Sequence, residues 1–149
     1  MLKKYKFGFE PWAVVLFLAI MAPNIYWFAN PTANDVLRRE SVTPCLDLIA
    51  SICQVVMVTV LCLLKRRDVS KIKLSKNIIF MITSYILYIV SWLLYFSGNA
   101  SAVVILALCI TPCLAFAFYA FDRKNYLALF PLGVFCICHV VFGIVNFIA

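Results

Sequence analysis

The sequence predicts an all-α integral membrane protein in which a bundle of five transmembrane helices forms a single domain over residues 1–149. Hydrophobic residues make up 66% of the chain and charged residues only 13%, which leaves too little polar surface to cover a water-soluble globule. Five apolar runs are each long enough to cross about 30 Å of hydrocarbon as a helix. Because these runs show no period-two alternation, helices are favoured over a β-barrel. We expect the helices at about 12–29, 46–64, 78–96, 102–121 and 126–147.

Most basic residues occur in three short segments that fall on one side of this bundle. They are Lys3, Lys4 and Lys6 at the N-terminus, Lys65, Arg66, Arg67, Lys71, Lys73 and Lys76 in a basic inner loop over 65–77, and Arg123 with Lys124 in a turn. Such segments mark the cytoplasmic side. We therefore expect a cytoplasmic N-terminus, an extracytoplasmic C-terminus and a multi-pass location in the cell membrane, most simply a bacterial plasma membrane. The bilayer then accounts for the net charge of +7, and nucleic acid is not an expected partner.

The first helix begins and ends with recognisable signals. Pro11 suits a first helical turn, and Glu10 suits the N-cap position, where the helix dipole favours a carboxylate. Residues 1–29 fit a retained helix better than a cleaved signal peptide. Pro23 predicts a kink because it removes a backbone hydrogen bond. Asn24 and Trp27 lie about one turn apart and share a face, which indicates either an interfacial aromatic belt or one wall of a pocket.

The outer loop over 30–45 is the main polar interruption of the chain. Asn34 or Asp35 is expected to cap a short surface helix. Asp35 is close enough to pair with Arg38 or Arg39, and Glu40 with Arg39. The loop is then a self-neutralised surface segment. The alternative is that the two arginines bind an anionic headgroup or a carboxylate ligand.

The second helix is expected to carry a polar stripe into the membrane. Thr43 and Pro44 suit its N-cap and first helical position, which places Asp47 in the first turn. Asp47, Ser51 and Gln54 follow at spacings of four and three and therefore share one face. An amide as deep as that of Gln54 must face the bundle, either as a contact between helices or as part of a ligand path.

The remaining helices carry two further stripes. Helix three places Tyr88, Ser91 and Tyr95 on one face, and helix five places His139 and Asn146 on one face. His139 is the only histidine and lies within the membrane, where a titratable group is a functional candidate. A neutral, hydrogen-bonded structural histidine is the alternative.

Enzyme chemistry has little support in the sequence. Six of the seven cysteines lie inside predicted helices, where small apolar packing is their expected role, and only Cys45 lies near the outer surface. There is no Cys-x-x-Cys or His-Glu-x-x-His motif, and a single histidine cannot supply paired haem ligands. We expect no catalytic residue, metal ligand or cofactor, although acid–base chemistry by Asp47 and His139 stays open.

The polar residues concentrate in the outer half of the bundle, whereas the inner half is expected to hold no comparable set. We infer an outward-opening pocket, capped by the 30–45 loop, that binds or transports a small amphipathic ligand or lipid. Its expected contacts are Asn24, Trp27, Arg38, Arg39, Asp47, Ser51, Gln54, Tyr88, Ser91, Tyr95, His139 and Asn146. Two alternatives are a structural, regulatory or immunity-type subunit that packs against a partner membrane protein or a second copy of the chain, and an intramembrane lipid-modifying enzyme.

In length, basic charge and five aromatic-rich helices, the chain resembles the tryptophan-rich sensory, translocator-type membrane proteins that bind porphyrins and sterols. The resemblance is one of architecture. The chain has only Trp12, Trp27 and Trp92, and its first outer loop has no Trp-x-Pro run. No residue role is transferred from that family.

Overall fold

A computed structural model describes residues 4–32, 35–69 and 72–148, and it contains five long helices. They are α1 Pro11–Ala29, α2 Pro44–Leu63, α3 Lys76–Phe96, α4 Ala102–Asp122 and α5 Leu129–Gly143, the last extended by the π-helical turn η3 Ile144–Ile148. All five are long and apolar enough to cross a membrane. The predicted class, a multi-pass bundle of five helices, is confirmed.

The helix ends follow local signals, with one shift. Pro11 and Pro44 each stand in the first turn of a helix, as expected from their missing N–H groups. Helix five begins at Leu129 rather than near 126. The reason is the turn that precedes it: Lys124 has φ 50°, and the N–H of Asn125 bonds back to the carbonyl of Ala120, so the chain needs a few residues to reverse direction.

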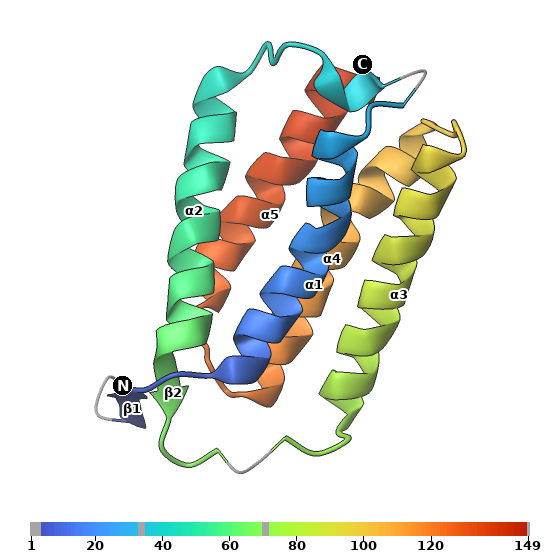
Figure 1. The fold of residues 1–149 in the computed structure, drawn as a ribbon. Helices are drawn as coiled ribbons and strands as arrows, with labels where there is room; N and C mark the ends of the chain where they lie inside the picture. The colour runs from blue at the N-terminus through green and yellow to red at the C-terminus, as the bar shows by residue number, and fades with distance from the viewer. Residues whose placement is uncertain (1–3, 33–34, 70–71, 149) are drawn as a thin grey trace.

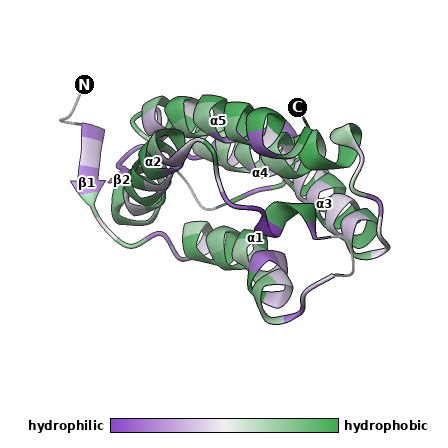
Figure 2. Ribbon diagram, turned by 90° about the horizontal axis from the view of Figure 1, so that it is seen from above, coloured by the Kyte–Doolittle hydropathy of each residue, from purple (hydrophilic) through white to green (hydrophobic). Residues whose placement is uncertain are grey.

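The helices form a curved row with one helix in front of it. In Figures 1 and 2, α2, α5, α4 and α3 lie side by side in that order, and α1 lies across the concave side of the row. Helix α4 is the most buried of the five and supplies more buried residues than any other helix. This arrangement leaves α1 in looser contact with the others.

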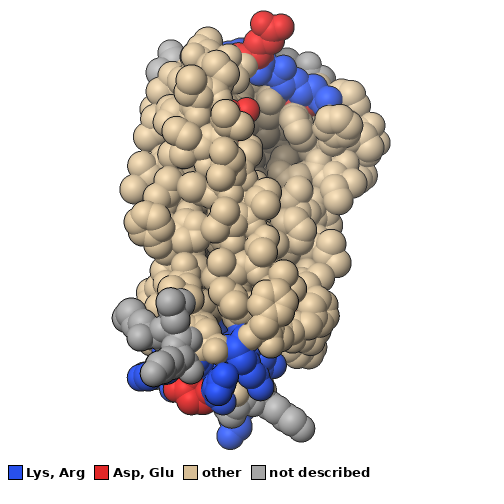
Figure 3. Space-filling view, turned by 90° about the vertical axis from the view of Figure 1, so that its left-hand side faces the viewer, with Lys and Arg blue, Asp and Glu red and all other residues tan. Residues whose placement is uncertain are grey.

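The two ends of the bundle differ in composition. The upper end in Figure 1 holds the C-terminal turn, the described parts of the 30–43 connection, with the short 3₁₀ helix η2 Val36–Arg38, and the turn over 97–101. The lower end holds the strands β1 Tyr5–Phe7 and β2 Leu64–Arg66, which pair antiparallel with Tyr5 opposite Arg66. Figure 3 shows basic side chains gathered at the lower end. The predicted grouping of basic segments is therefore present, apart from Lys3 and Lys71, which lie outside the described residues.

The short sheet was not expected, because the N-terminal segment reads as an amphipathic stretch on the lipid surface. The N–H of Gly8 and the N–H of Glu10 also bond to the carbonyls of Leu63 and Cys62, at 3.0 and 2.8 Å. Pairing satisfies backbone groups that neither segment can satisfy alone. It also holds the start of α1 against the end of α2.

Candidate functional site

A cavity of about 280 Å³ lies in the upper half of the bundle, enclosed by all five helices. Its lining residues are Ile20, Met21, Asn24, Trp27, Leu37, Asp47, Ala50, Ser51, Gln54, Tyr88, Trp92, Ile105, Leu108, Cys109, Pro112, Phe116, Phe135, His139, Phe142 and Phe147. Figure 3 shows a hollow on the face between α1 and α2, just below the charged upper end. The cavity exists because α1 stands away from the curved row of the other helices.

Seven of the twelve residues selected from the sequence line this cavity. They are Asn24, Trp27, Asp47, Ser51, Gln54, Tyr88 and His139. They come from α1, α2, α3 and α5, so the polar faces of four helices meet around one space. Whether these residues bind a ligand stays a prediction, but the structure does bring them together.

The other five residues lie elsewhere. Arg38 and Tyr95 belong to a network above the cavity, and Arg39 is exposed. The hydroxyl of Ser91 donates to the carbonyl of Leu87 in its own helix, at 2.8 Å. Asn146 accepts from the N–H of Val42 at 2.7 Å and donates to the hydroxyl of Thr43 at 2.7 Å. These last contacts tie η3 to the start of α2, so they support the cavity rather than line it.

Two tyrosines of α3 attach α1 near its proline. Pro23 cannot donate a hydrogen bond to the carbonyl of Ala19, and the hydroxyl of Tyr85 lies 3.5 Å from that oxygen. The next carbonyl, that of Ile20, accepts from the hydroxyl of Tyr88 at 3.1 Å and from Asn24 Nδ2 at 2.9 Å.

Asn24 Nδ2 also lies 2.6 Å from the Tyr88 hydroxyl. This cluster joins α1 to α3 across one side of the cavity. The tyrosine spacing in α3 therefore has a packing role in addition to its place in the cavity wall.

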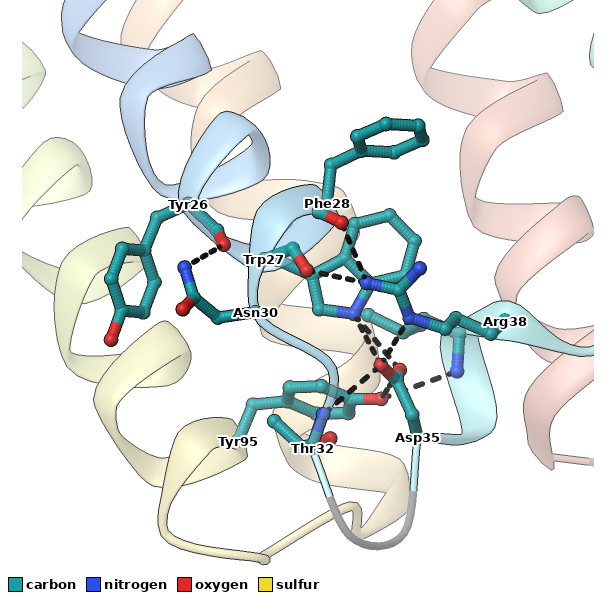
Figure 4. A network of polar contacts seen from close by, with 9 residues as sticks. Tyr26, Trp27, Phe28, Asn30, Thr32, Asp35, Arg38 and Tyr95 are labelled. Atoms are coloured by element: carbon teal, nitrogen blue, oxygen red, sulfur yellow. Dashed lines mark hydrogen bonds and ion pairs between the residues drawn. The ribbon is translucent and has the colours of Figure 1, made fainter.

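Asp35 is the centre of a network that closes the upper end (Figure 4). Its carboxylate accepts from Trp27 Nε1 at 2.9 and 3.0 Å, from the Tyr95 hydroxyl at 2.7 Å and from Arg38 Nε at 2.8 Å. The Tyr95 hydroxyl in turn accepts from the N–H of Leu37 at 3.2 Å. The carboxylate thus holds η2 against the upper ends of α1 and α3, and Leu37 becomes part of the cavity roof.

The network also decides the charge state of Asp35 and the position of Arg38. Burial acts to raise the pKa of Asp35, but the hydrogen bonds from Tyr95, Trp27 and Arg38 outweigh it and keep the pKa below its ordinary value of 3.8. Nη2 of Arg38 donates to the carbonyls of Trp27 and Phe28, at 2.6 and 3.0 Å. The guanidinium also lies 4.6 Å above the Trp27 ring.

The predicted pairing of Asp35 with Arg38 is therefore present. Glu40 and Arg39, which were expected to pair, are both exposed and make no ion pair with each other. The predicted surface helix of the loop is shorter than expected, a single 3₁₀ turn. Asp35 precedes it but does not cap it with its side chain, because the carboxylate is occupied by the network. Asn34, the other expected cap, lies outside the described residues.

Asp47 and His139 face the same space from α2 and α5. They make no direct ion pair, but the carboxylate is near enough to act electrostatically on the imidazole. The ring of His139 stacks on Phe135, with centroids 5.0 Å apart and planes 19° apart. The cavity therefore contains a carboxylate and an imidazole that both reach its interior.

Aromatic rings form the opposite wall around Trp92. Its ring lies 6.4 Å from that of Trp27 and 6.3 Å from that of Tyr88, and it stacks on Phe96 at 5.2 Å. Because Trp92 is almost fully buried, this group is a fixed surface. The cavity therefore has polar side chains along α2 and α5 and a rigid aromatic wall on α1 and α3.

The lower end holds a second buried polar cluster, so the expectation that the inner half has none is wrong. Glu10 is 4% exposed, and its Oε2 lies 3.0 Å from Lys65 Nζ and 3.5 Å from Arg123 Nη2. Asn125 Nδ2 donates to the carbonyls of Val60 and Leu64, at 3.0 and 2.9 Å. The hydroxyl of Ser75 donates to Asp122 across the neighbouring helices.

This cluster was missed because each member stands at the end of a different segment, where a charge reads as a helix-end signal. Glu10 precedes α1, Lys65 follows α2 and Arg123 follows α4. The available signal was the presence of an acidic residue among basic ones at one end of the bundle. The hollow beside the cluster measures only about 10 Å³, which is no more than the space for one water molecule.

Comparison with known proteins identifies no relative of this chain: no family model, no curated protein and no solved structure matches it. Within the described residues, no three histidine, cysteine, aspartate or glutamate side chains are grouped so that they could hold a metal ion.

Proposed function

We propose that this chain is a multi-pass protein of the cell membrane that binds or carries a small amphipathic molecule in the upper cavity. The observation that carries the proposal is the convergence of polar residues from four helices on one cavity of about 280 Å³. Ligand pockets combine a mostly apolar lining with a few polar groups that converge on it. Here Asn24, Gln54 and His139 supply such groups within an otherwise apolar and aromatic lining.

The proposal includes an orientation, with the lower end in the cytoplasm and the cavity in the outer half of the bilayer. The basic side chains at the lower end support it, since cytoplasmic segments carry an excess of lysine and arginine. Cys45 is exposed near the upper end of α2 and offers a natural reporter. A membrane-impermeant maleimide should label it in intact cells, and Cys45→Ser should remove that label. Labelling only after cell lysis would reverse the orientation.

The partner-subunit alternative receives less support from the geometry. A stripe that packs against another protein would face the outside of the bundle. Asp47, Ser51 and Gln54 line the cavity, where Gln54 is half-buried and Asp47 and Ser51 are exposed at the opening. The same cavity would be the site of a lipid-modifying reaction, but turnover needs groups positioned on a bond, and no such arrangement is evident among the described residues.

The direct test is native mass spectrometry of the full chain, released gently from its membrane, followed by extraction and identification of what accompanies it. We expect a small molecule in a fixed ratio to the protein. Ala50→Leu should reduce its occupancy, because Ala50 lines the cavity and the larger side chain fills part of it. Ala22→Leu is the matched control, since Ala22 is exposed on α1 and does not line the cavity.

Two outcomes would overturn the proposal. One is a protein that carries no small molecule but a stoichiometric partner polypeptide, which would favour the subunit function. The other is a small molecule whose occupancy falls equally in Ala50→Leu and in Ala22→Leu, which would place its site outside the cavity.

A further inference from the structure

The charge in the cavity has one sign. Among its lining residues, Asp47 is the only aspartate, glutamate, lysine or arginine. Its side chain is exposed to the cavity mouth and makes no hydrogen bond or ion pair with another described residue. A carboxylate inside a membrane protein is costly unless a partner of opposite charge or a donor group compensates it. The first turn of α2 favours the carboxylate through the helix dipole, and a cationic ligand at the exposed side chain would add a direct partner of opposite charge.

The arginines expected to bind an anionic group do not serve the cavity. Arg38 donates to the Asp35 carboxylate and to the carbonyls of Trp27 and Phe28, and it is not a lining residue. Arg39 is exposed and does not line the cavity either. An anionic headgroup would therefore meet Asp47 without a cation to offset it, and like charges repel.

The positions of Asp47 and of the aromatic lining residues indicate how a ligand would lie in the cavity. Asp47 stands in the first turn of α2, close to the upper end. Of the aromatic lining residues, Trp27 lies near the upper end of α1, Trp92 about one turn below the upper end of α3, and Phe135 nearer the middle of α5. A molecule with a charged head and a hydrocarbon part fits with its head at Asp47 and its hydrocarbon part on the aromatic wall.

The hollow between α1 and α2 in Figure 3 places the opening on the side of the bundle as well as near its upper end. A ligand dissolved in the bilayer can therefore reach Asp47 without crossing the Asp35 network. The volume of about 280 Å³ lies just below the range that is usual for ligand pockets, which is about 300–1,000 Å³. The occupant is a small molecule, or one short chain of a larger one.

We propose that the cavity selects a small lipophilic amine, whose ammonium group pairs with Asp47 and whose hydrocarbon part lies against Trp27 and Trp92. A charge-assisted hydrogen bond to the carboxylate favours a cation at Asp47, and the indole rings offer apolar surface to the hydrocarbon part. The inference rests on the proposed function and narrows it to one ligand class.

The test uses the tryptophans of the cavity as reporters. Trp12 lies on the lower part of α1, outside the cavity, so the full chain with Trp12→Phe retains only Trp27 and Trp92. Three brominated probes of equal, medium chain length, an amine, an alcohol and a carboxylic acid, are titrated in detergent, because bromine quenches indole fluorescence on contact. We expect saturable quenching, in which the amine probe binds most tightly and the carboxylic acid probe most weakly.

Substitution at Asp47 identifies the group responsible. Asp47→Asn should weaken binding of the amine probe by about tenfold, which corresponds to the loss of one hydrogen bond to a charged group. The affinity for the alcohol probe should not change. Asp47→Glu, which keeps the charge, should retain the preference for the amine. Because this carboxylate makes no hydrogen bond or ion pair with another described residue, the folded state should persist, and unchanged far-ultraviolet circular dichroism checks it.

The outcomes separate this inference from the proposed function. Saturable binding of all three probes with no preference for the amine, or a preference that survives Asp47→Asn, would overturn the ligand class and leave the cavity as a binding site. Quenching that never saturates with any probe would overturn both. Tighter binding of the carboxylic acid would reverse the assigned charge preference.

Discussion

The two ends of the bundle each bury a carboxylate that holds separate segments together, but they leave very different amounts of space. At the upper end, Asp35 joins α1, η2 and α3 above a cavity of about 280 Å³. At the lower end, Glu10 joins the starts and ends of α1, α2 and α4 beside a hollow of about 10 Å³. A buried carboxylate therefore lies above an open cavity at the upper end, whereas at the lower end a buried carboxylate holds closely packed segments together.

The difference comes from the size of the side chains near each carboxylate. Ala120 and Ala128 at the lower end are completely buried, and small residues allow backbones to approach closely. At the upper end, Trp27 and Trp92 stand between α1 and the helix row, with ring centroids 6.4 Å apart. The lower end is therefore closely packed, whereas the upper end encloses the cavity.

The largest expected effect on stability comes from substitution of Glu10, the buried carboxylate of the lower end. Glu10→Gln should lower the free energy of unfolding by about 3 kcal/mol, because a buried ion pair loses one partner, while Lys65 and Arg123 keep their charges. Unfolding in detergent, followed by circular dichroism, measures it. Ligand occupancy of the remaining folded protein should not change. Glu40→Gln, on an exposed side chain, is the control, and equal stability of the two variants would show that the lower cluster does not fasten the bundle.

A pair of matched substitutions compares the space at the two ends directly. Ala120→Leu should cost about 1–3 kcal/mol, because overpacking a filled interior forces neighbours to move. Ala50→Leu should cost less, under about 1 kcal/mol, because its added carbons enter the cavity. Thermal unfolding of both variants measures the difference. Equal losses would mean that the upper end is as tightly packed as the lower one.

The smallest expected effect is the acid dependence of the upper network. Since the pKa of folded Asp35 lies below 3.8, its carboxylate stabilises the fold above that pH, and the stabilisation disappears as the pH falls through the folded pKa. Asp35→Asn should lower stability at neutral pH by about 1–2 kcal/mol. The difference in melting temperature between the natural chain and the variant should shrink in acid. A difference as large in acid, well below pH 3.8, as at neutral pH would contradict the assignment.

The sequence was sufficient to predict which polar residues of several helices face the interior of the bundle. The stripe of Asp47, Ser51 and Gln54 was read from spacing alone, and all three residues line the cavity. Spacing suffices here because helical geometry fixes which residues share a face, and a polar side chain in hydrocarbon must turn inward. The same logic placed His139 and Tyr88 at the cavity.

The partners of the charged residues were not predictable. Spacing favoured pairing within the 30–45 loop, and Arg38 does pair with Asp35. Spacing did not show that Asp35 also accepts from Tyr95, 60 residues away. Nor did it show that Arg38 turns to the carbonyls at the end of α1 rather than to the cavity. Contacts of this kind depend on how far apart the helices stand.

By itself, the sequence determined that five apolar helices form, where prolines begin or interrupt them, and which polar residues share a face, because hydropathy and helical periodicity are local properties. Only the tertiary structure decided that Glu10 meets Arg123, that β1 pairs with β2, and that α1 stands away from the row of helices. The cavity that this leaves has Asp47 as the one acidic or basic side chain among its described lining residues. Those features arise from packing between distant segments, where side-chain volume and helix crossing, rather than local pattern, set the distances.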